Sequence, residues 1–259
     1  MSRKKFLCLI FLVVIFAGWF SFALYRYLNQ IVILSITTPI YSFQDVTFEL
    51  SNALRDPNVK ALILYIDSPG GYAYPCIEIA EQVKNFVKEK PLIAVMGSEC
   101  ASGAYYIASF ATEVITYNNT ITGGIGVLAI WVDLTKYYEE QGIKVWVWST
   151  GEEKDFGAPW RSPTEEEKAS IQAEVDRIFN KIMEDIKKNR DLTPEVAEDV
   201  GSGRIIYGYE AVEMGLADKV GDINTAIDDA AKISGLTLYI VVPSTMDFKA
   251  RFLRALGLL

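Results

Sequence analysis

The chain has 259 residues, of which 51% are hydrophobic, so it is long enough to bury a substantial core. The formal net charge is −8, and because the first 26 residues hold four basic side chains and no acidic one, the remainder carries 21 basic and 33 acidic residues, or −12. This acidic balance argues against a nucleic-acid-binding protein. The chain has no histidine, which excludes a catalytic triad that depends on one.

The three cysteines, Cys8, Cys76 and Cys100, match no zinc-ligand spacing. Without histidine they argue against a metal site. Cys8 lies in the apolar leader, so Cys76 and Cys100 are left as a pair that could form a disulfide but need not do so.

A basic start is followed by a long apolar stretch. Three of the first five residues are basic, and residues 6–25 are about 20 nearly uncharged residues, which as a helix would span roughly 30 Å, the thickness of a bilayer core. More positive charge precedes this stretch than follows it, so the N-terminus is expected in the cytoplasm and the rest of the chain outside the cell membrane. We predict that residues 1–26 are a cytoplasmic stub and transmembrane anchor. The alternative is a signal peptide that is cleaved near residues 21–23.

Strand and helix patterns alternate along the rest of the chain. Continuous apolar runs predict buried strands at residues 31–36, 61–66, 92–96, 114–116, 127–132, 144–148 and 238–242. Amphipathic spacing and capping residues predict helices at residues 45–54, 74–87, 104–110, 135–141, 164–190, from 193 onward, 208–214 and 223–233. This alternation indicates a layered α/β domain with a mainly parallel sheet over residues 27–243, followed by an amphipathic tail at residues 244–259.

Ser102 lies at a predicted turn between a strand and a helix. A hydroxyl at such a turn lies at the edge of the sheet, and the backbone N–H groups that follow it suit a developing oxyanion. The alternative is that Ser102 only caps the helix. If Ser102 is a nucleophile, the absence of histidine leaves a carboxylate or a lysine of lowered pKa as its base.

Two other stretches could complete such a site. Residues 67–71, Asp-Ser-Pro-Gly-Gly, end the second predicted strand, where open α/β sheets bind ligands, and the paired glycines allow a bound chain to come close. The alternative is a tight turn that needs glycine. Lys154 lies among aromatic residues and glycines, and apolar burial can lower the pKa of a lysine, at a cost of roughly 4 kcal/mol for three units. Its alternative is an exposed lysine that pairs with Glu153 or Asp155.

Five groups of short motifs follow one another between about residues 31 and 242. They are Ser68-Pro69-Gly70-Gly71; Gly97-Ser98 and Ala101-Ser102-Gly103 with Tyr105-Tyr106-Ile107-Ala108; Thr122-Gly123 with Ile125-Gly126-Val127; Lys154-Asp155 with Pro159 and Arg161; and Gly203-Arg204 with Gly208-Tyr209-Glu210-Ala211 and Gly215-Leu216-Ala217-Asp218. In this order they resemble the short bacterial and archaeal form of signal peptide peptidase. That family consists of membrane-anchored serine proteases related in fold to Clp protease and to the crotonases.

The resemblance implies a role for each of four residues. Ser102 would be the nucleophile, Lys154 the general base and then the acid that protonates the leaving amine, and the N–H groups of Gly71 and Gly103 the oxyanion hole. It also implies a ring-like homo-oligomer in which serine and lysine meet across a protomer boundary, with no cofactor or metal.

The sequence therefore predicts a membrane-anchored serine endopeptidase with an extracytoplasmic catalytic domain. Its substrates would be hydrophobic peptides, such as remnant signal peptides. The alternatives are a related membrane protease that trims a specific membrane protein and a catalytically inactive oligomeric scaffold.

Two residues depart from the family pattern. Gly124 stands where the family usually has a serine that orients the lysine ammonium, so water, Thr122 or another group would have to do so. Glu99 adds a charge close to Ser102, and if it faces the site it would favour the protonated lysine. The missing hydroxyl at Gly124 favours the scaffold alternative, whereas the retained Ser102 and Lys154 argue against it.

Overall fold

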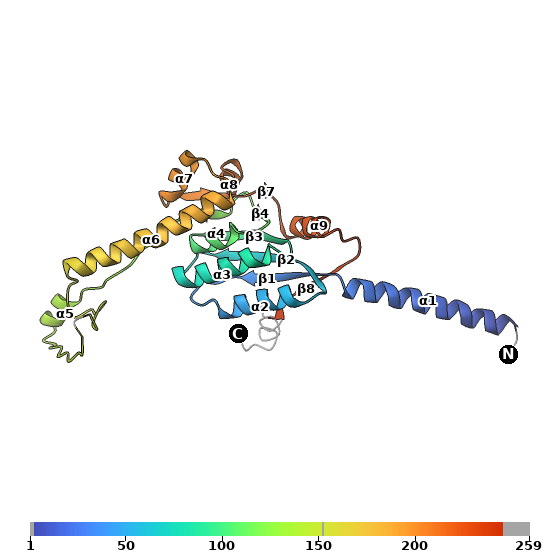
Figure 1. Ribbon diagram of the computed structural model, residues 1–259, viewed down its shortest axis with the longest axis horizontal. Helices are drawn as coiled ribbons and strands as arrows, with labels where there is room; N and C mark the ends of the chain where they lie inside the picture. Colours follow the sequence, from blue (N-terminus) through green and yellow to red (C-terminus); the bar gives the residue numbers. More distant parts are fainter. Residues whose placement is uncertain (1–2, 152, 246–259) are drawn as a thin grey trace. The chain divides into compact units, whose positions relative to one another are not determined.

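The computed structural model describes residues 3–151 and 153–245, and Figure 1 labels its elements. The helices are α1 (Arg3–Tyr27), α2 (Gln44–Arg55), α3 (Ala73–Phe86), α4 (Gly103–Ala108), α5 (Thr135–Glu140), α6 (Glu165–Asn189), α7 (Pro194–Gly201), α8 (Gly208–Glu213) and α9 (Ile223–Ile233). The strands are β1 (Gln30–Ile36), β2 (Val59–Ser68), β3 (Leu92–Ala101), β4 (Glu113–Thr116), β5 (Ile121–Gly123), β6 (Ile205–Tyr207), β7 (Lys219–Val220) and β8 (Ile240–Pro243).

The chain divides into two compact units. Unit 2 is Gly126–Asp185 and contains α5 and most of α6, whereas unit 1 holds the described residues on either side and contains the whole sheet. The predicted division into residues 1–26, 27–243 and 244–259 stays a prediction. Most of its last part, residues 246–259, lies outside the described residues.

Unit 1 is built on one sheet with the strand order β6-β5-β3-β2-β1-β8, to which β4 is added beside β3 and β7 beside β4. All of these pairings are parallel except that between β5 and β6. This confirms the predicted α/β class with a mainly parallel sheet. The pairing of β2 with β3 continues to Ser68 opposite Cys100, so the two carboxyl ends that carry the predicted motifs lie side by side.

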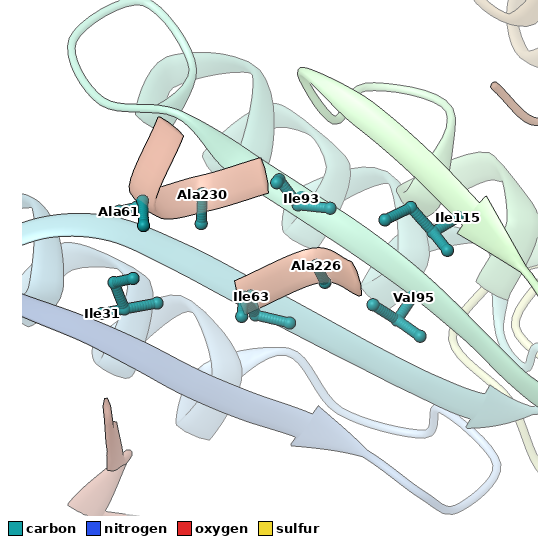
Figure 2. Close-up of a cluster of buried hydrophobic side chains, with 9 residues drawn as sticks. Ile31, Ala61, Ile63, Ile93, Val95, Ile115, Ala226 and Ala230 are labelled. Atoms are coloured by element: carbon teal, nitrogen blue, oxygen red, sulfur yellow. The ribbon is translucent and has the colours of Figure 1, made fainter. Parts of the chain in front are cut away.

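The core of the sheet explains why its central strands are continuously apolar. On one face, small side chains of α9 pack against alternate residues of the strands, and Figure 2 shows Ala226 and Ala230 beside Ile63, Ile93 and Val95. The residues between them point to the opposite face, where α2, α3 and α4 pack. Because both faces are covered, each central strand is hydrophobic along its length.

Two predicted strands are wrong. Residues 127–132 and 144–148, which the structure describes in full, form no strand and flank the short helix α5 in unit 2. Their apolar side chains are exposed: Ile130 is 78% exposed and Trp148 is 86% exposed. The apolar residues of these two segments indicate only a preference for extended backbone. A ladder also needs a partner strand and a covered face, which unit 2 does not supply.

Helix α1 covers the segment predicted as a membrane anchor. Most of the large apolar side chains between Ile10 and Tyr25 are exposed. In the part of the chain that the structure describes, no helix is long and apolar enough to cross a membrane.

Candidate active site

Ser102 occupies a strained turn between β3 and α4. Its φ of 53° and ψ of −127° are rare for a residue with a side chain and cost about 1–3 kcal/mol. The turn is held because the N–H of Ser102 donates to the carbonyl oxygen of Gly123 (2.8 Å) and its carbonyl oxygen accepts from the N–H of Tyr106 (3.0 Å). Ser102 is the N-cap residue of α4, but its side chain makes no capping hydrogen bond. A serine on a strained strand-to-helix turn is the geometry that exposes a nucleophilic hydroxyl.

Two backbone N–H groups lie next to this turn. Gly103 is the first residue of α4, so its N–H has no acceptor within the helix. Gly71 forms a parallel bridge with Ile40: the N–H of Ile40 donates to Gly70 (2.8 Å) and the N–H of Tyr72 donates to Ile40 (2.9 Å). Both hydrogen bonds of this bridge use the neighbours of Gly71, residues 70 and 72. The N–H of Gly71 itself therefore points away from Ile40.

The glycine pair lies directly against the serine. A Cβ atom added to Gly70 would lie 3.0 Å from the Cβ atom of Ser102 and 2.9 Å from the nitrogen of Gly103, and Gly70 has a φ of +97°. A Cβ atom added to Gly103 would lie 3.8 Å from the nitrogen of Gly71. The backbones of residues 70–71 and 102–103 therefore approach as closely as glycine allows. Unit 1 thus brings together three of the four predicted site residues: Ser102, Gly103 and Gly71.

Two polar side chains, buried Ser68 and half-buried Asp67, fix this arrangement. The hydroxyl of Ser68 accepts from the N–H of Gly70 (3.2 Å), and a carboxylate oxygen of Asp67 accepts from the N–H of Glu99 (3.0 Å). Asp67 and Ser68 therefore tie the end of β2 to the turn at Gly70 and to β3. Glu99 is half-buried on β3, and its expected effect on the base stays a prediction.

Thr122, one of the groups that could replace the hydroxyl missing at Gly124, already has a hydrogen-bond partner within unit 1, and its role toward Lys154 stays a prediction. Its side chain is buried and donates to the carbonyl oxygen of Cys100 (2.6 Å), so it fastens β5 to β3. Gly124 has a φ of +59°, and the nearest atom to a Cβ atom added there is the Cβ atom of Ala101 at 4.0 Å. A serine side chain would therefore have room at residue 124, but the backbone conformation disfavours it.

Lys154 belongs to unit 2 and lies there in an exposed turn. Its N–H donates to the carbonyl oxygen of Gly151 (3.3 Å). The carboxylate of the neighbouring Asp155 pairs with the guanidinium of Arg161 (2.8 Å), so the predicted alternative of a Lys154–Asp155 pair is not formed.

Cys76 is a neighbour of the site that the sequence did not indicate. A Cβ atom added to Gly103 would lie 2.4 Å from the Sγ atom of Cys76, so this buried side chain of α3 lies directly against the first turn of α4. Cys76 and Cys100 are both free and buried, so the possible disulfide between them is not formed. Among the described residues, no group of three or more acidic or cysteine side chains is placed to hold a metal ion.

We predict that Cys76 resists alkylation in the folded protein. Burial raises the pKa of its thiol to about 12, so at pH 8 only about one thiol in 10⁴ is ionised, and the reactive species is the thiolate. Iodoacetamide at pH 8 should modify Cys76 only after addition of denaturant, as measured by mass spectrometry of the peptide that contains it. Rapid modification without denaturant would show that α3 does not bury this side chain.

Comparison with known sequences gives a match to a family model and matches to individual proteins. The model of peptidase family S49 matches residues 84–237, which include Ser102 and Lys154. A protein of Enterococcus faecium, provisionally named signal peptide peptidase SppA, is 30% identical over 208 residues, which cover 80% of this chain and 60% of the relative. Protease 4 of Haemophilus influenzae is 32% identical over 187 residues, which cover 71% of this chain and 30% of that protein.

A solved structure shares the fold. A mutant of the 1510-N membrane-bound stomatin-specific protease superposes with a TM-score of 0.53 and 18% identity, over 77% of this chain and 84% of that one. At this level of identity the likeness concerns the fold alone.

Proposed function

Since the chain belongs to peptidase family S49, we propose that it is a serine endopeptidase whose nucleophile is Ser102. The observation that carries the proposal is the strained turn at Ser102, with φ 53°, close to the backbone nitrogens of Gly71 and Gly103. A fold maintains such strain when the strained residue has a function.

The proposed mechanism is acyl transfer. Neutral Lys154 takes the proton of the Ser102 hydroxyl while Oγ attacks the scissile carbonyl, and the N–H groups of Gly71 and Gly103 stabilise the oxyanion. The lysine ammonium then gives its proton to the leaving amine, which leaves an ester on Ser102. The neutral amine of Lys154 then takes a proton from a water molecule, which attacks the ester. Lys154 returns this proton to Oγ of Ser102 as the peptide acid leaves. No metal or cofactor takes part.

The proposed substrates are hydrophobic peptides, such as remnant signal peptides. Aromatic side chains next to the oxyanion glycine support this choice. Tyr72, which follows Gly71 in the chain, contacts the ring of Tyr41 (centroids 5.3 Å apart), and Tyr41, Tyr72 and Tyr74 are each 64% exposed. Exposed aromatic groups bind apolar peptide segments by burying their rings.

We further propose, from the apolar sequence of residues 6–25, that residues 1–26 anchor the protein in the cell membrane, with the N-terminus in the cytoplasm and the catalytic domain outside. The basic residues Arg3, Lys4 and Lys5 before the apolar stretch, and the exposed apolar side chains between Ile10 and Tyr25, support this topology.

We also propose a ring-like homo-oligomer. Unit 2 exposes a large set of apolar side chains, which a soluble monomer rarely does. They are Leu128, Ile130, Val132, Val145, Trp146, Val147 and Trp148.

The test is cleavage of a fluorogenic apolar peptide by the detergent-solubilised full chain. We expect Ser102→Ala and Lys154→Ala each to lower kcat by about 10³-fold or more, because each removes a group on which the reaction depends. Lys168→Ala, which removes an exposed lysine of the same unit, is the matched control and should keep the wild-type rate. Between pH 6 and 10 the rate should rise with pH as the base loses its proton. We call this rising part of the profile the basic limb.

Three results would contradict parts of the proposal. Undiminished cleavage by Lys154→Ala would remove Lys154 from the mechanism. Labelling of Ser102→Ala by a fluorophosphonate would place the nucleophile elsewhere. A folded oligomer that neither cleaves nor is labelled would favour the inactive scaffold.

A further inference from the structure

We infer that Arg161 is the positioning residue of the general base: it fixes the turn that carries Lys154 and neutralises the carboxylates beside it. The inference rests on the proposed function, because it gives Lys154 the role of base. It concerns unit 2 only, and every contact that carries it lies within Gly126–Asp185.

Arg161 forms a bidentate ion pair (a fork) with each of two carboxylates. Its Nε and Nη2 atoms donate to the two carboxylate oxygens of Asp155 (2.9 and 2.8 Å). Its Nη1 and Nη2 atoms donate to the two carboxylate oxygens of Glu167 (2.8 and 2.6 Å). The guanidinium also lies over the ring of Trp131 (5.3 Å to the centroid), whose indole N–H donates to the carbonyl oxygen of Arg161 (3.2 Å). Such planar bidentate pairing is specific to arginine.

These contacts connect the Lys154 turn to a long helix. Asp155 follows Lys154 directly. Its backbone carbonyl oxygen accepts from the N–H of Ala158 (3.0 Å), so Asp155 is part of the turn that carries Lys154. Glu167 lies in the first turn of α6, where its carboxylate also accepts from the N–H of Thr164 (2.8 Å). Arg161 therefore holds the backbone at Lys154 against the beginning of a 25-residue helix.

Arg161 also sets the charge around Lys154. The ionisable groups that line the cavity beside this turn are Glu153, Asp155, Arg161, Glu166 and Glu167. Hydrogen bonds from Arg161 hold the pKa of Asp155 below its ordinary range and lower that of Glu167 to about 2, so both carboxylates are ionised wherever a lysine titrates. Without Arg161, the uncompensated carboxylate of Asp155, which is next to Lys154 in the chain, would favour the ammonium form of Lys154 and oppose its use as a base.

Two substitutions should act in opposite directions. Arg161→Gln leaves Asp155 and Glu167 without their counter-charge, so the basic limb of the pH profile should move to higher pH. A shift of one unit would slow the reaction about tenfold at pH 7. Asp155→Asn removes one negative charge and keeps Arg161 paired with Glu167, so the limb should move to lower pH. A purely structural role for Arg161 would lower the rate in both variants but would not move the limb in opposite directions.

The experiment measures the rate at which a fluorophosphonate labels Ser102 in the full chain, as a function of pH. The variants are Arg161→Gln, Arg161→Lys and Asp155→Asn. Arg161→Lys keeps the charge and loses a fork, so its limb should stay near that of the wild type while its rate falls. The control is Arg177→Gln, which breaks an exposed pair with Glu174 on α6 (2.6 Å) and should label like the wild type.

Each outcome decides the question. Opposite shifts of the limb support the inference, and limbs that coincide with that of the wild type overturn it. If circular dichroism shows that Arg161→Gln does not fold, the shift in Asp155→Asn alone supports or overturns it. Failure of the proposed function is seen separately, because Lys154→Ala would then be labelled as fast as the wild type, whatever the result at Arg161.

Discussion

Replacing Gly71 with alanine is expected to lower kcat by about 10²–10³-fold and to destabilise unit 1 by about 2–3 kcal/mol. The new Cβ atom would lie 2.1 Å from the carbonyl oxygen of Ile40 and 2.6 Å from its carbonyl carbon and its nitrogen. These are backbone atoms, so no side-chain rotation relieves the overlap. Either the bridge between Gly71 and Ile40 opens or the N–H of Gly71 leaves its place beside Ser102. Loss of one oxyanion donor costs about 10²–10³-fold in kcat.

Urea unfolding and fluorophosphonate labelling of the same preparation measure the two effects. The control for stability is Gly126→Ala, because a Cβ atom there meets nothing within 4 Å and the φ of Gly126 is not in the left-handed region. That variant should match or slightly exceed the wild-type stability. If Gly71→Ala labels at the wild-type rate, Gly71 is not an oxyanion donor.

The sequence predicts β4 and β8 in part, at residues 114–116 and 238–242, and it predicts best the strands that the sheet buries on both faces. The apolar runs at residues 31–36, 61–66 and 92–96 correspond to β1, β2 and β3, because covered faces require hydrophobic residues throughout. The strands β5, β6 and β7 have two or three residues each, too few to show a period, and they depend on pairing with β3, β4 or each other. The same reliance on partners explains why residues 127–132 and 144–148 look like strands in the sequence and form none.

The candidate site divides in the same way. The sequence indicates Ser102, Gly71 and Gly103 because each lies at the carboxyl end of a predicted strand, and the structure places the three together. The strain at Ser102 and the packing of Cys76 against Gly103 arise from tertiary contacts, which no local pattern contains. The same holds for Thr122. Its burial and its donation to the carbonyl oxygen of Cys100 depend on the pairing of β5 with β3, which no local pattern contains.

Mixing two inactive variants is expected to restore activity. Ser102→Ala lacks the proposed nucleophile and Lys154→Ala lacks the proposed base, and the two residues belong to different units of the chain. If each active site takes its serine from one protomer and its lysine from the neighbour, random assembly of equal amounts leaves about a quarter of the sites with both groups. Co-expression with two affinity tags and purification on both should therefore give about a quarter of the wild-type rate of peptide cleavage.

The control is co-expression of Ser102→Ala with the double variant Ser102→Ala/Lys154→Ala, which contains no intact nucleophile and should stay inactive. A site assembled within one chain predicts no activity in either mixture, because every protomer then lacks one of its own two groups. The mixture therefore separates a dyad formed between protomers from one formed within a chain. If activity returns, assembly completes the active site, and the isolated chain is inactive because each protomer has the nucleophile of one site and the base of the next.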